Sequence, residues 1–531
     1  MEVGEAFSGR AARRAAYRNA KVLKAVDTGI GWLKSHQEED GHWDLKNFMK
    51  HDPAGDRCDG PGKNYYDVGV TSLALLAMLA QGDSLHYDSC NRAADWIAKQ
   101  LGDDGRVSNA INDFIYPQAL ATAAMAESAA TLGGSRFRKS AQLAVDYLES
   151  HRTPGAGWRY KPRAKTSDTS VLSWCMSAYF AGGSIGLNVK AETVGEAMGW
   201  LDSVTNYDTG KAGYTEINQS SARKPGDHGT RFPAHHGHAL TASGLHARMM
   251  AGLSPRSELA IRAANLLNER PPKWGDGSID LYYWLQGSIA MEQLLGTPQH
   301  RAWRKALHAA LLPSQQKKGS ARGSWDPIGA WCDSGGRVYA TAMNVLSLSS
   351  DYRFGSTHAM ALIPKTPAFR RIQNAWRKDR IGEAAKVLRK LPEAELTKRE
   401  KIAKARLEWY VTVEETKVKA VLATLETRWP SPVARVKRLQ LMGDRYKGLA
   451  AGDEIKTTLK QLLADPAVKS ELAASTALAK LQKDFAKAMK SSNRPRRRSV
   501  GKKLHALVSK YPGTAAAKEA LKMAQRVLSG T

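Results

Sequence analysis

The stretch VDTGIGWLKSHQEEDGHW, residues 26–43, holds the pattern that decides the fold. Its first half places apolar residues at helical spacing, and its second half is a turn that ends in Gly, His and Trp. Gly supplies the positive φ that ends a helix, and the aromatic residue after it can stack on a neighbouring unit. The unit recurs about every 50 residues, with looser copies at 92–107, 143–158, 197–214, 263–278 and 307–325.

Each turn leads into a second segment that is rich in Ala, Ser, Thr and Gly. These segments are apolar on nearly every side, as buried helices are, whereas the first helix of each pair is amphipathic and should lie outside. The pattern predicts an all-α, six-repeat α/α-toroid, a twelve-helix double barrel, over residues 21–355, with residues 1–20 as a leading helix or linker. The inner helices are expected to begin near Tyr66, Tyr116, Ser167, His235, Tyr282 and Gly336.

The segment SHQEEDGHW, residues 35–43, resembles the QW repeat of squalene–hopene cyclases and oxidosqualene cyclases. The alternation of twelve helices is similar to that family and to the β-subunits of protein prenyltransferases, over roughly residues 20–355. This resemblance implies the toroid fold, and it says less about activity because fold and function are separable.

Residues 356–531 differ in composition from the repeats and form a predicted basic, helical second domain. They carry 39 Lys and Arg against 16 Asp and Glu, whereas the first 355 residues carry 40 against 35. SKYPGTAAAKEALKMAQRVL, residues 509–528, resembles the last helix pair of a tetratricopeptide-like repeat, which implies a docking surface for a protein partner. The run NRPRRRSVGKK, residues 493–503, favours either an acidic partner or a solvated helical face.

In a toroid, the loops that enter the inner helices converge at one end of the central cavity, so residues about 50 positions apart can meet. Tyr and Trp would suit an apolar ligand, which the resemblance implies to be an isoprenoid or related lipid, and their faces can stabilise a cation. Arg337 could instead bind an anion, and the aromatic residues could simply fill the funnel. The candidate pocket residues are Tyr66, Asp67, Asp113, Tyr116, Asp280, Tyr283, Trp284, Arg337 and Tyr339.

The segment KTSDTSVLSW, residues 165–174, is the candidate for acid chemistry. Class II terpene cyclases protonate their substrate with an Asp-x-Asp-Asp-Thr motif at the start of an inner helix. Asp168 and Thr169 match the last two residues of that motif, but Ser167 takes the place of the proton donor, which argues against squalene cyclisation. Asp168 is therefore either a catalytic acid or an N-cap of its helix.

The segment GDHGTRFPAHHGHAL, residues 226–240, is the candidate for metal binding. Neutral imidazole is a good zinc ligand, so His235, His236 and His238 are the candidate ligands, with solvated or helix-capping histidines as the alternative. Apart from zinc at this cluster we expect no cofactor. Four cysteines stand far apart without a zinc or redox motif, as in a reducing compartment.

The sequence holds no run of about 18 apolar residues and no apolar signal-peptide segment, so we expect a cytoplasmic protein without a transmembrane segment. Two classes of function remain. In the first, the toroid is a binding or scaffold module that lacks the cyclase acid motif. In the second, it is an enzyme that acts on an isoprenoid or related lipid, of the terpene cyclase or prenyltransferase type.

Overall fold

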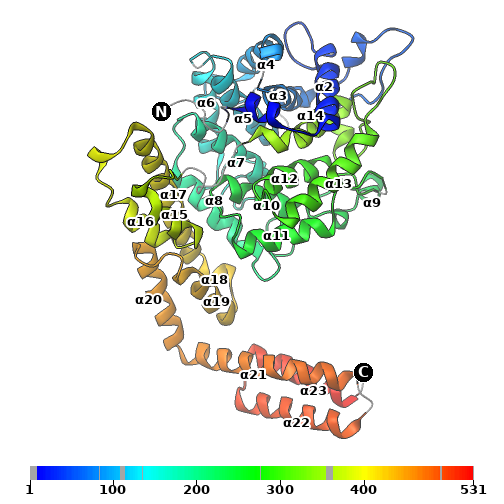
Figure 1. Ribbon diagram of the computed structural model, residues 1–531. Coiled ribbons are helices and arrows are strands. Elements are labelled where there is room, and N and C mark those ends of the chain that lie inside the picture. Colours follow the sequence, from blue (N-terminus) through cyan, green and yellow to red (C-terminus); the bar gives the residue numbers. More distant parts are fainter. Residues whose placement is uncertain are drawn as a thin grey trace. The chain divides into compact units, whose positions relative to one another are not determined.

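The computed structural model describes residues 7, 9–82, 84–107, 114–133, 135–275, 277–354, 363–490 and 493–529 (Figure 1). The candidate pocket residue Asp113 lies outside the described residues. The chain divides into two compact units. The first unit comprises Met1–Asp379 and Leu388–Ala420, and the second comprises Arg380–Val387 and Val421–Thr531.

The first unit is an all-α toroid, as the repeats predict. Its inner helices contact one another in chain order, and the last one, α14, contacts α3, so the ring is closed (Figure 1). Nearly every residue of α3, α5, α7, α10 and α12 is buried, because small side chains let these helices approach closely. The inner helices are α3 (Asp67–Leu79), α5 (Ile115–Thr131), α7 (Thr169–Ser184), α10 (Ala239–Met250), α12 (Leu281–Glu292) and α14 (Cys332–Arg353).

Five of the outer helices bury one face against the ring and leave the other in solvent, whereas α8 (Ala191–Ser203) is buried along nearly its whole length. Two further helices of this unit, α15 (Arg370–Arg377) and α17 (Lys398–Ala423), follow the repeats. Gly195 leaves room for α17, because a Cβ at this position would lie 2.6 Å from the Cβ of Thr416. The outer helices are α2 (Ala20–Ser35), α4 (Tyr87–Gln100), α6 (Arg138–His151), α8 (Ala191–Ser203), α11 (Glu258–Glu269) and α13 (Pro298–Ser314).

The turn that follows α2 joins the first repeat to the second. The buried amide of Gln37 donates to the Gly41 carbonyl (2.8 Å) and to the Ser89 carbonyl (2.9 Å), 52 residues away. The Trp43 indole donates to the Leu33 carbonyl (2.8 Å), which ties the turn back onto its own helix. The same indole-to-helix bond recurs from Trp158 to Leu148 (2.8 Å) and from Trp325 to Leu311 (2.9 Å).

A buried ionic cluster closes the end of the ring where the inner helices finish. Arg10, in the short leading helix α1 (Arg10–Ala16), donates to Glu127 Oε2 (2.7 Å) and to the carbonyls of Leu79 (3.2 Å) and Arg353 (3.0 Å). Arg353 donates to the other oxygen of Glu127 (2.9 Å), and Arg13 donates to the Arg353 carbonyl (3.1 Å). The guanidinium groups of Arg10 and Arg353 therefore share one carboxylate, and those of Arg10 and Arg13 satisfy carbonyls at helix ends that have no partner within their own helix.

The second unit is helical, and three of its helices, α21, α22 and α23, pack around a common apolar core (Figure 1). Its assignment as a tetratricopeptide-like domain that begins at residue 356 stays a prediction. Among the described helices, none combines the length and hydropathy that crossing a bilayer requires. The helices of this unit are α16 (Ile381–Leu388), α18 (Leu425–Arg428), α19 (Pro432–Gly443), α20 (Ala450–Ala464), α21 (Pro466–Met489), α22 (Arg494–Lys510) and α23 (Ala515–Ser529).

We predict that Glu127→Ala destabilises the toroid by about 3–5 kcal/mol, because it leaves two buried guanidinium groups without a counter-ion. Burial alone would raise the pKa of Glu127, but Arg10 and Arg353 hold it below its ordinary value. The stabilisation is therefore present above the unfolded-state pKa of about 4.3 and is lost as the pH falls towards the folded-state pKa. Urea unfolding of the full chain at pH 7 and pH 4 measures both effects; equal midpoints for the variant and wild type at pH 7 would contradict this role.

Candidate functional site

A cavity of about 210 Å³ lies at the end of the ring where the inner helices begin. Residues from the first turns of α3, α5, α7 and α12 line it, together with the start of α14 and the segment that precedes α9 (Asp227–Arg231). Its wall is dominated by aromatic rings and aliphatic side chains. The aromatic lining residues are Tyr66, Tyr116, Tyr160, Trp174, Tyr214, Tyr282, Trp331 and Tyr339.

Three of the predicted pocket residues, Tyr66, Tyr116 and Tyr339, lie in this lining. Asp67 is not among the lining residues. It begins α3, and its carboxylate accepts a hydrogen bond from the Leu45 amide (3.1 Å). Burial raises the pKa of Asp67 to about 7. The carboxyl group nevertheless binds the backbone of the turn at Leu45 and does not line the cavity.

The aromatic run at the start of α12 shows how helical geometry selects the pocket residue. Tyr282 faces the cavity, where its hydroxyl lies 2.5 Å from Ser243 Oγ. Successive side chains on a helix point about 100° apart, so Tyr283 and Trp284 point away from the cavity. Tyr283 instead donates to the Arg270 carbonyl (2.8 Å) beyond the end of α11. The sequence-based prediction named Tyr283 and Trp284, whereas the residue that lines the cavity is Tyr282, directly before them.

Arg337 and Asp280 are held in ion pairs outside the cavity lining. Arg337 pairs with Asp326 (2.9 Å) and with Asp59, and it thereby ties the last repeat to the first. Asp280 caps α12 by accepting from the Tyr283 amide (3.0 Å), and it pairs with Arg223 (2.7 Å). Both predicted residues thus stabilise segments around the cavity and are not among its lining residues.

Asp168 is fully buried at the start of α7, and one of its oxygens caps the helix. Oδ1 accepts from the Val171 amide (2.8 Å) and from Ser170 Oγ (2.7 Å), whereas Oδ2 is buried without a hydrogen-bond partner. Burial raises the pKa of Asp168 above its ordinary value. Ser170 Oγ lies 2.9 Å from the Tyr116 hydroxyl, so a chain of two hydroxyl groups links this carboxyl group to the cavity wall.

The histidine cluster does not form a preformed metal site. His235 and His236 lie in the short helix η4 (Ala234–His236), with ring centroids 4.7 Å apart, and His238 is the N-cap residue of α10. Among the described residues, the groups that bring three ligand atoms within 4.8 Å of one another do not include these histidines. Burial lowers the pKa of His238, which favours its neutral form.

Two cationic residues fasten the segment Ser221–Lys224 over the rim of the cavity. The Arg223 guanidinium is nearly buried, pairs with Asp280, donates to the Phe232 carbonyl (2.9 Å) and lies 5.7 Å from the Trp331 ring centre. Lys224 is more exposed and bonds to Asp333 (2.6 Å) and to Ser334 (2.7 Å). Sequence reasoning missed this segment, because no repeat or motif connects it to the inner helices.

Leu73, Leu120 and Trp174 line both this cavity and a smaller one of about 30 Å³. That second cavity reaches His246, whose Nδ1 lies 2.5 Å from Gln286 Oε1, and the buried pair of Glu127 and Arg353. Burial lowers the pKa of His246 to about 4, so this imidazole is neutral at physiological pH. Apart from Lys224 at the rim, the described residues that line the two cavities are therefore uncharged down to the ionic cluster.

The chain is similar to solved structures only at low sequence identity. A type II terpene cyclase from Scytonema bound to merosterolic acid A is 14% identical, with a TM-score of 0.41 over 62% of this chain and 97% of that one. Cellobiose 2-epimerase from Bacillus thermoamylovorans is 11% identical, with a TM-score of 0.43 over 62% of this chain and 99% of that one. No protein-family model matches the sequence, and no curated protein matches it significantly.

We predict that the two rim contacts differ strongly in strength. Arg223→Ala removes a nearly buried ion pair and several hydrogen bonds, so the amides of Ser221–Lys224 should exchange with deuterium at least about tenfold faster. Lys224→Ala removes a more exposed pair, which is worth less than about 1 kcal/mol, and should change exchange little. Hydrogen–deuterium exchange of the two variants tests this order, and the reverse order would refute it.

Proposed function

We propose that the toroid is a binding module that holds a compact, largely apolar ligand in the aromatic cavity, and that the ligand belongs to the isoprenoids or related lipids. The observation that carries this proposal is the composition of the lining. Among the described lining residues there is no carboxylate, imidazole or thiol, and the charged group there, Lys224, is already bonded to Asp333 and Ser334. Such a wall offers contact area to an apolar body and supplies no carboxylate, imidazole or thiol to bind a metal ion.

The size of the cavity limits the ligand further. Ordinary ligand pockets measure roughly 300–1,000 Å³, and this one measures about 210 Å³. A compact molecule fits whole, whereas a longer isoprenoid chain enters with one end only. Tyr hydroxyl groups at the wall supply the few polar contacts that fix the orientation of an apolar ligand.

An enzyme that acts on an isoprenoid is the alternative, and the environment of Asp168 favours it. A buried carboxyl group with a raised pKa and one oxygen without a partner retains its proton near neutral pH more readily than an exposed one. In the structure Ser170 Oγ donates to Oδ1, so outward transfer would need the proton on Oδ1 and both hydroxyl groups turned. Asp168 would then donate to Ser170, Ser170 to Tyr116 and Tyr116 to the substrate, and the surrounding rings would stabilise the cation formed. Loss of a proton from that cation would return the proton to the relay.

The second unit supports a separate proposal, that it docks an acidic or protein partner. Residues 421–531 carry 23 Lys and Arg against 8 Asp and Glu. Most of the basic side chains at the start of α22, among them Arg494 and Arg496, are exposed. A strongly basic surface of this kind raises the affinity for anionic partners at low salt.

We predict that farnesol, used as the isoprenoid probe, binds the full chain with one equivalent in equilibrium dialysis. Leu120→Trp places an indole into the cavity wall and should weaken binding by more than about tenfold, a loss of about 1.4 kcal/mol. Leu85→Trp is the matched control, because Leu85 is 77% exposed and lies outside the cavity. Equal binding by wild type and Leu120→Trp would place the ligand elsewhere and contradict the proposal.

We predict that Asp168→Asn leaves the helix cap in place, because an amide oxygen can accept the same two hydrogen bonds, so stability changes by less than about 1 kcal/mol. Ionisation of Asp168 opposes folding, because its folded-state pKa is raised. Wild type should therefore lose stability relative to the variant as the pH rises from about 3.9. Thermal unfolding between pH 4 and 8 checks this.

The same variant separates the two functional hypotheses. In a binding module, Asp168→Asn and Tyr116→Phe both retain farnesol. In an enzyme, both abolish product formation from isoprenoid substrates, as followed by mass spectrometry, while binding survives. Product formation that survives in both variants would exclude the relay.

A further inference from the structure

A buried group of three potential metal ligands lies in the first repeat, outside the lining of the aromatic cavity. It consists of His36 at the end of α2, with Asp52 and Cys58 from the loop that follows η1 (Phe48–His51). One ligand atom from each lies within 4.8 Å of the other two. The His36 and Asp52 side chains are 3% and 4% exposed, and Cys58 is 8% exposed.

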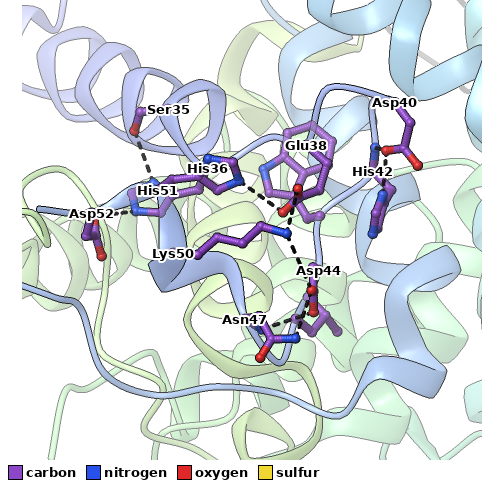
Figure 2. Close-up of polar contacts among 12 residues, drawn as sticks. Ser35, His36, Glu38, Asp40, His42, Asp44, Asn47, Lys50, His51 and Asp52 are labelled. Atoms are coloured by element: carbon purple, nitrogen blue, oxygen red, sulfur yellow. Dashed lines mark hydrogen bonds and ion pairs between the residues drawn. The ribbon is translucent and has the colours of Figure 1, made fainter. Parts of the chain in front are cut away.

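The hydrogen bonds of His36 fix which ring nitrogen faces the group. Nδ1 lies 2.7 Å from the Trp32 carbonyl, which can only accept, so Nδ1 carries the hydrogen. In the neutral ring, Nε2 then presents its lone pair to Asp52 Oδ1, 2.9 Å away (Figure 2). Two acceptor atoms at this distance require a cation between them, which is either a proton on the imidazole or a metal ion.

Residues around His36 and Asp52 make the hydrogen bonds that usually orient metal-binding side chains. A ligating histidine almost always donates its other ring N–H to a carbonyl or carboxylate, as His36 does to Trp32. Asp52 Oδ2 accepts from the Cys58 amide (2.8 Å), which orients the carboxylate. The imidazole also stacks on the Trp32 ring, with 4.1 Å between the ring centroids. The His36 ring and the Asp52 carboxylate are therefore held in place before any ion enters.

A proton would join only His36 and Asp52, whereas a metal ion would use the thiolate of Cys58 as well. One imidazole, one carboxylate and one thiolate suit Zn²⁺, and their two negative charges balance the ion in a buried setting. At Zn–N and Zn–O distances of about 2.0–2.2 Å, tetrahedral binding needs Nε2 and Oδ1 to separate by only a few tenths of an ångström. From this geometry we propose that His36, Asp52 and Cys58 bind one zinc ion, with water in the fourth position.

Another group of three candidate ligands, Glu292, His300 and Asp351, is less suited to an ion. The Arg304 guanidinium already lies 2.7 Å from Asp351 and supplies the positive charge there. The group of Glu292, His300 and Asp351 also contains no thiol. A spectroscopic signal that requires a thiolate ligand therefore distinguishes it from the group that contains Cys58.

The test uses the full chain, treated with a chelator and dialysed under reducing conditions, and then titrated with Co²⁺ and Zn²⁺ alone. We expect one equivalent of Co²⁺ to produce a thiolate-to-metal charge-transfer band that Zn²⁺ abolishes, and Zn²⁺ to raise the unfolding temperature. Cys58→Ala should lose the band, and His36→Gln should weaken binding by more than about tenfold. Cys175→Ala, which removes a buried cysteine of α7, is the matched control and should keep both signals.

A second variant keeps the test decisive should Cys58→Ala fail to fold. The chain with Cys90, Cys175 and Cys332 replaced by Ala retains Cys58 as its single cysteine and should keep the charge-transfer band. Absence of a band in wild type, or a band that persists in folded Cys58→Ala, overturns the proposal. An unfolding temperature that Zn²⁺ leaves unchanged in wild type overturns it as well, and leaves a proton between His36 and Asp52.

Discussion

The ring closes where residues 60–63 run against the start of α14, and this contact sets the geometry of everything inside it. The Lys63 amide donates to the Ser334 carbonyl (2.8 Å), and the Arg337 amide donates to the Gly60 carbonyl (2.9 Å). Gly336 permits this approach, because its φ is 66° and a Cβ there would lie 2.5 Å from the Gly62 nitrogen. Without closure, six helical hairpins would form an open arc, and the apolar inner helices would face solvent.

Closure of a ring whose inner helices run in the same direction produces two chemically different ends. Helix amino termini carry partial positive charge and carboxyl termini partial negative charge. At the carboxyl end, Arg10 and Arg13 donate to free carbonyls, and Glu127 balances the charge that they bring. At the amino end, Asp168 and Asp280 cap their own helices. The charged groups at both ends are thereby engaged with the fold, which leaves the cavity between them to aromatic and aliphatic side chains.

The sequence predicts the ring well, because small-residue segments and Gly-rich turns repeat along the chain. Four of the six inner helices begin within two residues of the expected positions. The helix expected near His235 begins at Ala239, after the short helix η4, and the helix expected near Gly336 begins at Cys332. The candidate site is predicted only in part. Tyr282 and Tyr283 are adjacent in the sequence, but Tyr282 faces the cavity whereas Tyr283 faces the outer helix α11. Tyr160, Tyr214 and Trp331 come from turns, where no periodicity gives the direction of a side chain. The residues 36, 52 and 58 are spaced unlike any zinc motif, so only the folded loop brings them together.

The loop between α2 and α3 links the proposed zinc site, the closure and the cavity. It carries Asp52 and Cys58, then Gly60 and Gly62 at the closure, and then Tyr66 at the cavity wall. Apart from the short helices η1 and η2 (Asn64–Tyr66) the loop lacks regular structure, so side-chain contacts must fix its course. An ion that joins the end of α2 to two points of this loop would bind the folded loop and not the unfolded chain, and would thereby stabilise the course of the loop. Since none of its ligands lines the cavity, such an ion acts on the ligand only through the position of the loop, and recognition remains with the aromatic wall.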